Sequence, residues 1–215
     1  VGSFALAHNG NLVNAASLKN QLEMQGSIFQ TTSDTEVLAH LIRRSGTGAF
    51  KDRVKQAISL VEGAYAFLVM TETDMLVAVD PHGLRPVSIG RLGKAYVVAS
   101  ETCAFDLVGA EYIRDVEPGE LVIINDEGLH SELFAVSSGR AMCSMEYIYF
   151  SRPDSNIDGI NVHTARKSLG KRLAMEAQIE ADVVTGVPDS SISAAIGFAE
   201  ASGIPYEMGL IKNRY

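Results

Sequence analysis

A run of short apolar segments between residues 64 and 136 constrains the fold of this chain more than any other feature. Each segment has the length of a β-strand, and glycine, proline and aspartate stand between successive segments. This spacing is typical of antiparallel strands joined by tight turns. The predicted strands are AYAFLVMTE, MLVAVD, VSIG, AYVVASE, ELVIIND and SELFAV, and the predicted turns among them are DPHGLRP and EPGE.

Three amphipathic helices are predicted ahead of these strands, over residues 14–26, 31–46 and 50–63. In the second helix, apolar side chains recur on one face, and Ser33-Asp34-Thr35-Glu36 has the S-x-x-E form of a capping box. Gly26 is suited to end the first helix, because glycine readily adopts the left-handed conformation at a C′ position. Helices packed on strands in this order predict a layered α+β architecture.

The pattern changes beyond residue 136. Residues 137–160 are rich in turn-forming residues and carry no sustained period, so we expect a domain boundary there. After it, a helix over residues 162–177 is followed by the strand DVVTGVP, the helix SSISAAIGFAEASG and a strand that begins with PYEMGLIK. This alternation predicts that the chain contains the beginning of a parallel α/β domain.

The composition narrows the class of protein. A formal net charge of -8 over 215 residues argues against a primary role in binding nucleic acid or an anionic membrane, and no apolar run is long enough to span a bilayer. The two cysteines form neither a disulfide framework nor a metal quartet by themselves, and the chain carries no signal peptide, which favours the cytoplasm. Because both ends of the sequence look cut, we expect it to be part of a longer enzyme.

Asn9-Gly10, which follows a predicted strand over residues 4–8, admits two interpretations. The dipeptide is the strongest short signal for a two-residue hairpin turn. Alternatively, the Asn9 amide and the Gly10 backbone N–H donate hydrogen bonds to a developing oxyanion, since glycine allows close approach to a ligand. Asp34 likewise either complements the dipole of the second helix or pairs with the α-ammonium group of an amino-acid substrate. These two roles are compatible, because Ser33 can cap the helix while Asp34 faces outward.

Several motifs together resemble a known family. The segments AHNGNLVN, TTSDTEVLAHLI, GAYAFLVM, DPHGLRPVSIG and YVVASET resemble the class II glutamine amidotransferase domain, which is an N-terminal nucleophile hydrolase. The tail, from CSMEYIYFSRPDS to GLIKNRY, is similar to the iron–sulfur type of amidophosphoribosyltransferase. The resemblance implies an αββα fold with antiparallel sheets over residues 1–140, an interdomain segment over 141–160, and the beginning of a type I phosphoribosyltransferase domain over 161–215.

Members of that family use ammonia released from glutamine to make 5-phosphoribosylamine from phosphoribosyl pyrophosphate, the first step of de novo purine synthesis. By resemblance, Asn9 and Gly10 form the oxyanion hole and Asp34 holds the α-amino group of glutamine. His8 precedes this pair and is left open between a structural and a supporting role. The family's nucleophile is an N-terminal cysteine, which Val1 does not provide, so we expect this chain by itself to have no glutaminase activity. The complete enzyme is expected to be a homotetramer inhibited by purine nucleotides.

The resemblance implies further site residues in the second half of the chain. Ser190, Lys212 and Arg214 match positions that bind nucleotide phosphates. From the residues alone, Ser190 is equally an ordinary helix cap, and a pair of cations like Lys212 and Arg214 is usually a solvated strand edge. Cys143 matches one of four thiolate ligands of a [4Fe–4S] cluster, and its alternative is a small buried side chain. The other ligands and the acidic motif that binds Mg²⁺ with phosphoribosyl pyrophosphate have no match here, so we expect both cofactors to be absent or incomplete.

Two other functions stay open at this point. A different class II amidotransferase, such as glucosamine-6-phosphate synthase, would share the N-terminal motifs but continue into sugar-isomerase repeats. A binding or regulatory module that has lost the nucleophile would keep the fold without catalysis.

Overall fold

The structure is a computed structural model that describes residues 2–137 and 139–213. The chain forms two compact units, each built from two stretches of sequence. The first unit comprises Val1–Ile89 and Arg114–Met142, and the second comprises Gly90–Ile113 and Cys143–Tyr215. The chain therefore leaves the first unit, returns to it and leaves it again.

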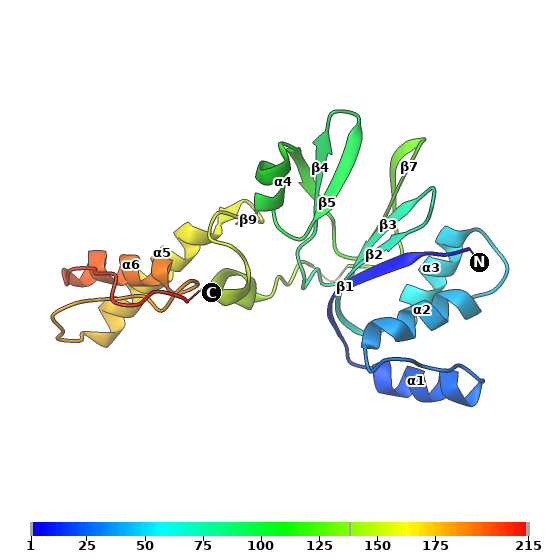
Figure 1. The fold of residues 1–215 in the computed structure, drawn as a ribbon, viewed down its shortest axis with the longest axis horizontal. Helices are drawn as coiled ribbons and strands as arrows, with labels where there is room; N and C mark the ends of the chain where they lie inside the picture. The colour runs from blue at the N-terminus through cyan, green and yellow to red at the C-terminus, as the bar shows by residue number, and fades with distance from the viewer. Residues whose placement is uncertain (1, 138, 214–215) are drawn as a thin grey trace. The chain divides into compact units, whose positions relative to one another are not determined.

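A five-stranded sheet forms the centre of the first unit. Its strands follow the order β1-β2-β3-β7-β8, and every neighbouring pair is antiparallel. The antiparallel arrangement predicted from the short apolar segments is thus confirmed (Figure 1). The strands are β1 (Ala5–Leu12), β2 (Gly63–Met70), β3 (Met75–Val79), β7 (Glu120–Asn125) and β8 (Gly128–Leu133).

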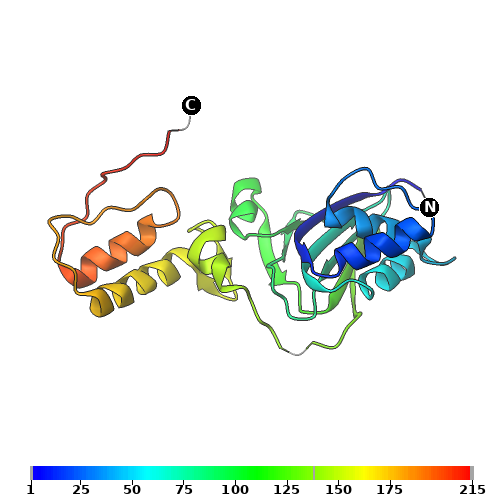
Figure 2. The same cartoon turned by 90° about the horizontal axis from the view of Figure 1, so that it is seen from below.

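Three helices cover one face of this sheet. They are α1 (Ala15–Met24), α2 (Asp34–Arg44) and α3 (Phe50–Ile58). α2 packs against β1, while α1 and α3 pack against α2, so the helices lie together on one side of β1, β2 and β3 (Figures 1 and 2). The apolar face of α2 is at most 7% exposed, and burial of each such side chain stabilises the fold by about 1.5–3 kcal/mol. That face consists of Val37, Leu38, Leu41 and Ile42.

α3 ends at Ile58, earlier than the predicted end at residue 63. The Asn14 side chain accounts for the difference. Its amide donates a hydrogen bond to Leu60 O at 2.9 Å, and its Oδ1 accepts one from Glu62 N at 3.0 Å. These bonds occupy backbone groups that a longer helix would use for itself, and they lead the chain directly into β2.

A second sheet has three strands in the order β5-β4-β6. These strands are β4 (Ser88–Leu92), β5 (Ala95–Ala99) and β6 (Glu111–Asp115), and the short helix α4 (Cys103–Val108) precedes β6. The chain passes between the two units within β4 and again within β6. β6 was not predicted, because its sequence EYIRD is polar at both ends and carries no clear strand alternation.

Two helices dominate the C-terminal part of the second unit. They are α5 (Val162–Ala177), which has the predicted bounds, and α6 (Ile192–Ser202). They lie side by side (Figures 1 and 2), and two glycines let their backbones touch. A Cβ on Gly170 would lie 2.7 Å from the carbonyl carbon of Ala194, and one on Gly197 would lie 2.8 Å from that of Lys167. Among the described residues, no helix combines the length and the apolar character needed to cross a membrane.

The turn-rich segment ahead of α5 contains short elements that the sequence did not indicate. One is a single π-helical turn, η1 (Glu146–Phe150), and the other is a small hairpin of β9 (Asn156–Ile157) and β10 (Ile160–Asn161). Each is too short to produce a hydrophobic period.

The two strands predicted in this unit are wrong as extended strands. DVVTGVP contributes only Val184, which forms a single parallel bridge with Tyr206 of PYEMGLIK. Val184 N donates to Pro205 O, and Glu207 N donates to Val184 O, both at 2.9 Å. The parallel direction is the one expected, but a lone pair of segments lacks the neighbouring strands that a stable sheet needs.

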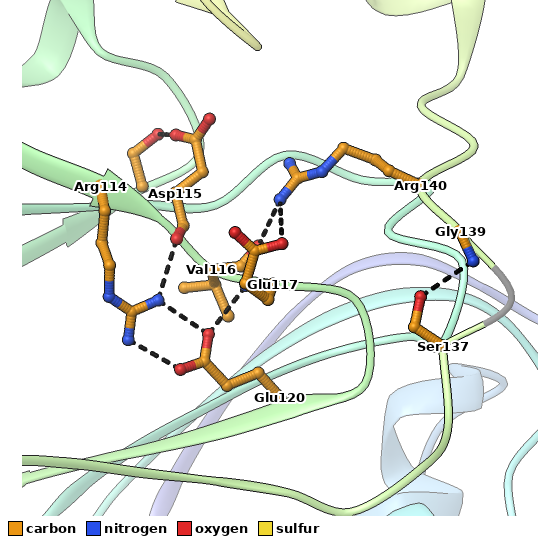
Figure 3. A network of polar contacts seen from close by, with 9 residues as sticks. Arg114, Asp115, Val116, Glu117, Glu120, Ser137, Gly139 and Arg140 are labelled. Carbon is orange, nitrogen blue, oxygen red and sulfur yellow. Dashed lines mark hydrogen bonds and ion pairs between the residues drawn. The ribbon is translucent and has the colours of Figure 1, made fainter.

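Polar contacts join the last residues of the first unit to the turn between β6 and β7 (Figure 3). The Arg140 guanidinium donates to Val116 O at 3.2 Å and to the Glu117 carboxylate at 3.1 Å. Ala141 N also donates to His82 O at 2.7 Å. The chain is therefore anchored to the first unit just before it enters the second.

A buried carboxylate lies beside these contacts. Glu120 is 5% exposed and receives two hydrogen bonds from Arg114, at 2.8 and 2.7 Å (Figure 3). Burial alone would raise the pKa of Glu120, but the bonds from Arg114 and from Glu117 N hold the pKa below its usual value. Arg114 and Glu120 thus form a paired charge at the start of β7.

Candidate active site

The structure corrects the hairpin interpretation of Asn9-Gly10. Both residues lie inside β1, where Asn9 is opposite Ala66 and Gly10 is opposite Tyr65. Gly10 has a φ of +146°, and a Cβ there would lie 2.8 Å from the Ala64 carbonyl carbon and 2.9 Å from the Tyr65 Cα. Glycine is therefore required because β1 and β2 approach closely, and not because the chain turns.

β1 is an edge strand, so half of its backbone N–H groups face away from β2. Leu12 N–H is one of them, because it donates to Asp34 Oδ2 at 2.9 Å, while Val13 N donates to Glu62 O on the opposite side. Successive backbone groups of a strand alternate between its two edges. The Gly10 N–H, two residues before Leu12, therefore points to the same free edge as Asp34.

The Asn9 side chain lies on the opposite face of β1 from its neighbour His8 and is exposed. Within the part of the chain that the structure describes, its amide makes no hydrogen bond. The Asn9 amide and the Gly10 N–H are thus two donors on adjacent residues, and a pair of such donors can stabilise a developing oxyanion.

Asp34 opens α2 and faces β1. Ser33 is the N-cap, and its side chain accepts a hydrogen bond from Thr35 N at 3.3 Å. The prediction that Ser33 caps the helix is confirmed, whereas the expectation that Asp34 faces outward is wrong, because its side chain turns toward β1 and accepts a hydrogen bond from Leu12 N. The Asp34 side chain is 25% exposed, and its Oδ2 accepts a hydrogen bond from Leu12 N, which leaves acceptor capacity for a cationic group.

The predicted capping box is only half formed. Instead of bonding back to Ser33, the Glu36 carboxylate accepts bonds from the Thr31 hydroxyl at 2.6 Å and from the backbone N–H groups of Gln30 and Thr31 at 2.8 Å. These hydrogen bonds, led by that of Thr31, lower the pKa of Glu36 to about 2. Glu36 therefore orders the loop in front of α2, on which the position of Asp34 depends.

His8 lies behind Asp34, on the core face of β1. Its Nδ1 is 3.1 Å from Thr35 Oγ1 and 3.5 Å from Asp34 Oδ1, and its ring centroid is 4.5 Å from that of Phe67. The side chain is 3% exposed, and among the described residues Nε2 has no hydrogen-bond partner. Burial lowers the pKa of His8 below 6.5 although the Asp34 charge opposes this, so the ring is neutral at pH 7. Residue spacing alone gave no sign of this contact.

Ser190 and Lys212 line one cavity of about 600 Å³ within the second unit. Arg152 lines the same cavity, as does Asp189, whose carboxylate is 4.0 Å from Lys212 Nζ. The N-terminus of α6 follows Ser190 closely in the sequence. Arg214, the third residue predicted to contact phosphates, lies outside the described residues, and phosphate binding by the other two stays a prediction.

Cys103 and Cys143 are free thiols of the second unit. Cys103 is buried in α4, whereas Cys143 is half-buried. Among the described residues, no three His, Cys, Asp or Glu side chains converge as ligands for a metal ion. A [4Fe–4S] cluster takes about four thiolates, so these residues do not fit a complete cluster site, and Cys143 offers one ligand at most.

Comparisons with known proteins cover the whole chain. The glutamine amidotransferase domain matches residues 1–106. Over 214 residues, the chain is 75% identical to the amidophosphoribosyltransferase of Bacillus subtilis, covering 100% of this chain and 45% of that protein. It is 50% identical to the amidophosphoribosyltransferase of Staphylococcus epidermidis, covering 99% and 43%. The chain thus spans slightly less than half the length of the curated relatives it matches.

Two solved structures are similar to this chain at a TM-score of 0.95 and 75% sequence identity. One is the glutamine phosphoribosylpyrophosphate amidotransferase of Bacillus subtilis complexed with ADP and GMP, of which the match covers 47%. The other is described as the allosteric regulatory enzyme of purine biosynthesis, of which the match covers 46%. Both matches cover 100% of this chain.

Proposed function

Because the chain belongs to the amidophosphoribosyltransferase family, we propose that it forms part of an enzyme that makes 5-phosphoribosylamine from phosphoribosyl pyrophosphate and glutamine, the first step of de novo purine synthesis. The observation that carries this proposal is the free edge of β1. The Gly10 N–H and the Asp34 carboxylate both lie along this edge. The first can bind the side-chain oxygen of a glutamine molecule, and the second can bind its α-ammonium group.

The spacing of these groups supports glutamine as the ligand. The N–H groups of Gly10 and Leu12 are two residues apart, which is about 6–7 Å along an extended strand. Asp34 is bonded to Leu12 N, so its carboxylate marks one end of that span. Five covalent bonds separate the α-nitrogen of glutamine from its side-chain oxygen, which is roughly 6 Å when extended. One glutamine molecule can therefore reach both groups.

Each of these residues has one task in glutamine hydrolysis. A nucleophile attacks the side-chain amide carbon, whose oxygen becomes an oxyanion. The proton of the nucleophile passes to the amide nitrogen, so ammonia leaves when the C–N bond breaks, and water then cleaves the acyl intermediate to glutamate and the free nucleophile. The Gly10 N–H and the Asn9 amide donate hydrogen bonds to that oxyanion. The Asp34 carboxylate accepts hydrogen bonds from the α-ammonium group and so orients the substrate. Ammonia then displaces pyrophosphate from C1 of phosphoribosyl pyrophosphate, as a C–N bond replaces a C–O bond.

We propose residues 1–140 as the glutaminase domain and residues 161–215 as the beginning of the phosphoribosyltransferase domain. Ser190 and Lys212 are proposed to contact the phosphates of a bound nucleotide, because they line one cavity with Arg152. Cys143 is proposed as one thiolate ligand of an iron–sulfur cluster, and free thiols suit a reducing cytoplasm.

The test uses a chimera in which this chain replaces the matching residues of the Bacillus subtilis relative. We expect the chimera to make phosphoribosylamine with either glutamine or ammonia. Asp34→Ala should raise the KM for glutamine by about 10- to 100-fold, the value of hydrogen bonds to a charged group, without changing the ammonia-dependent rate. Asp52→Ala, which removes another first-turn acid, on α3, is the matched control and should change neither. A chimera that uses ammonia but not glutamine would contradict the proposal.

A further inference from the structure

His8 is a buried polar residue at a place where the fold by itself favours an apolar one. Its core-facing neighbours along β1 are Leu6 and Leu12, and its ring packs on the buried Phe67. The side chain is 3% exposed, yet among the described residues Nε2 has no hydrogen-bond partner. A buried nitrogen without a hydrogen-bond partner lowers the stability of the fold, and a leucine at this position would avoid that loss.

The other ring nitrogen faces the proposed ammonium pocket. Nδ1 is 3.5 Å from Asp34 Oδ1 and 3.1 Å from Thr35 Oγ1. The Thr35 hydroxyl donates to Asp34 Oδ1 at 3.5 Å, which leaves Oγ1 to accept a hydrogen bond from Nδ1. Because the ionised carboxylate also only accepts hydrogen bonds, both neighbours favour the Nδ1–H tautomer. Leu12 N–H meanwhile donates to Asp34 Oδ2 at 2.9 Å, so the carboxylate has a donor beside each oxygen.

We propose that His8 is a positioning residue that holds the Asp34 carboxylate toward the α-ammonium group of glutamine, an inference that rests on the proposed function. The neutral ring is suited to this task because it donates a hydrogen bond without adding a positive charge that would compete with the ammonium group. The unpartnered Nε2 lowers the stability of the fold, and the contribution of His8 to glutamine binding explains why a histidine is nevertheless present.

Protonation of the His8 ring is expected to weaken the binding of glutamine at Asp34. The charged groups that act on His8 are Asp34 on α2 and Arg85, which lies between β3 and β4, while β2 contributes the uncharged Phe67. Burial, followed by Arg85, lowers the pKa of His8 below 6.5 against the opposing effect of Asp34. When the pH falls through this lowered pKa, an imidazolium forms beside Asp34 and competes with the ammonium group of glutamine, so the KM for glutamine rises.

The test compares three variants in the chimera described above. His8→Leu removes the donor and should raise the KM for glutamine about tenfold, without changing the ammonia-dependent rate. His8→Asn places an amide N–H near the position of Nδ1 and should restore a KM within about threefold of the parent, without the rise at acid pH. His130→Asn, on β8 at the opposite edge of the same sheet, is the control and should change neither quantity.

A thermal denaturation experiment separates positioning from a structural role. Since leucine removes the stranded Nε2, we expect His8→Leu to unfold at the same or a higher temperature than the parent. A lower unfolding temperature with an unchanged KM would overturn the proposal, as would an equal rise in KM for His8→Leu and His8→Asn. If His8→Leu does not fold, nitrogen NMR of the unmodified chain decides, because an Nε2–H tautomer would overturn the proposal.

The parent chimera distinguishes failure of this proposal from failure of the proposed function. If the parent uses ammonia but not glutamine, both proposals are overturned. If the parent uses glutamine and His8→Leu has the same KM for glutamine, only the role of His8 is overturned.

Discussion

Replacement of Gly10 by alanine tests the close approach of β1 and β2 on which the candidate site depends. The added Cβ would lie 2.8 Å from the Ala64 carbonyl carbon and 2.9 Å from the Tyr65 Cα. Both are backbone atoms, so no side-chain rotation relieves the overlap. Alanine would in addition have to adopt a φ of +146°, which an L-residue rarely does.

The expected loss of stability follows from these two terms. Overpacking costs about 1–3 kcal/mol, and a disfavoured φ costs a further 1–3 kcal/mol or so. We therefore expect the free energy of unfolding to fall by roughly 2–6 kcal/mol, a large part of the total of about 5–15 kcal/mol that is typical of a folded domain. At about 2–4 °C per kcal/mol, the unfolding temperature should fall by about 4–24 °C.

The assay is urea and thermal denaturation of the 215-residue chain, with Gly128→Ala as the matched control. Gly128 has a φ of +120°, and a Cβ there would have no atom within 4 Å. This control carries a comparable cost in φ without the overlap, so the difference between the two variants isolates the strand contact. Equal losses in the two variants would refute the argument that β2 requires glycine at Gly10.

Two further predictions concern charged groups of the first unit. Because the folded-state pKa of Glu36 is lowered to about 2, its contribution to stability is complete above pH 4.5 and is lost as the pH falls toward 2. Urea denaturation across this range should therefore show the difference between the parent and Glu36→Gln shrinking as the pH falls, and a constant difference would contradict this. Arg114→Met should destabilise the chain by about 2–3 kcal/mol, since it leaves the buried Glu120 without its cation. Because Arg114 is partly exposed, this loss is smaller than that expected for a fully buried pair. The exposed pair of Lys55 and Glu132 is the control, and Lys55→Met should cost about 1 kcal/mol or less; equal losses would count against the role of burial.

Helices and antiparallel strands could be predicted because their signals are local. The bounds of α5 follow from its own residues, and the start of α2 follows from the Ser33 cap. The end of α3 could not be predicted, because it depends on Asn14, which is 46 residues from the Leu60 carbonyl that it binds. β6 was missed for a similar reason, since a polar strand is recognised by its partners and not by its own period.

In the candidate site, too, features set by neighbouring residues could be predicted, and features set by residues distant in the sequence could not. That Ser33 caps α2 was predictable from the residues around it, whereas the hydrogen bond that turns Asp34 toward β1 comes from Leu12, 22 positions away, and was not. The Asn9-Gly10 hairpin was wrong because the dipeptide carries no information about β2, whose pairing with β1 overrides the local turn preference. The contact between His8 and Thr35 joins residues 27 positions apart, so only the folded chain shows that His8 lies behind Asp34.

The central claim is that the free edge of β1 binds glutamine and stabilises its oxyanion. The most direct test is the ratio of glutamine-dependent to ammonia-dependent synthesis of phosphoribosylamine, measured for the chimera and for its Asn9→Ala variant. Loss of one oxyanion donor should lower this ratio by about 10²–10³ while the ammonia-dependent rate largely survives. Equal losses of both rates would mean that Asn9 is structural, and an unchanged ratio would mean that the edge of β1 is not the glutamine site.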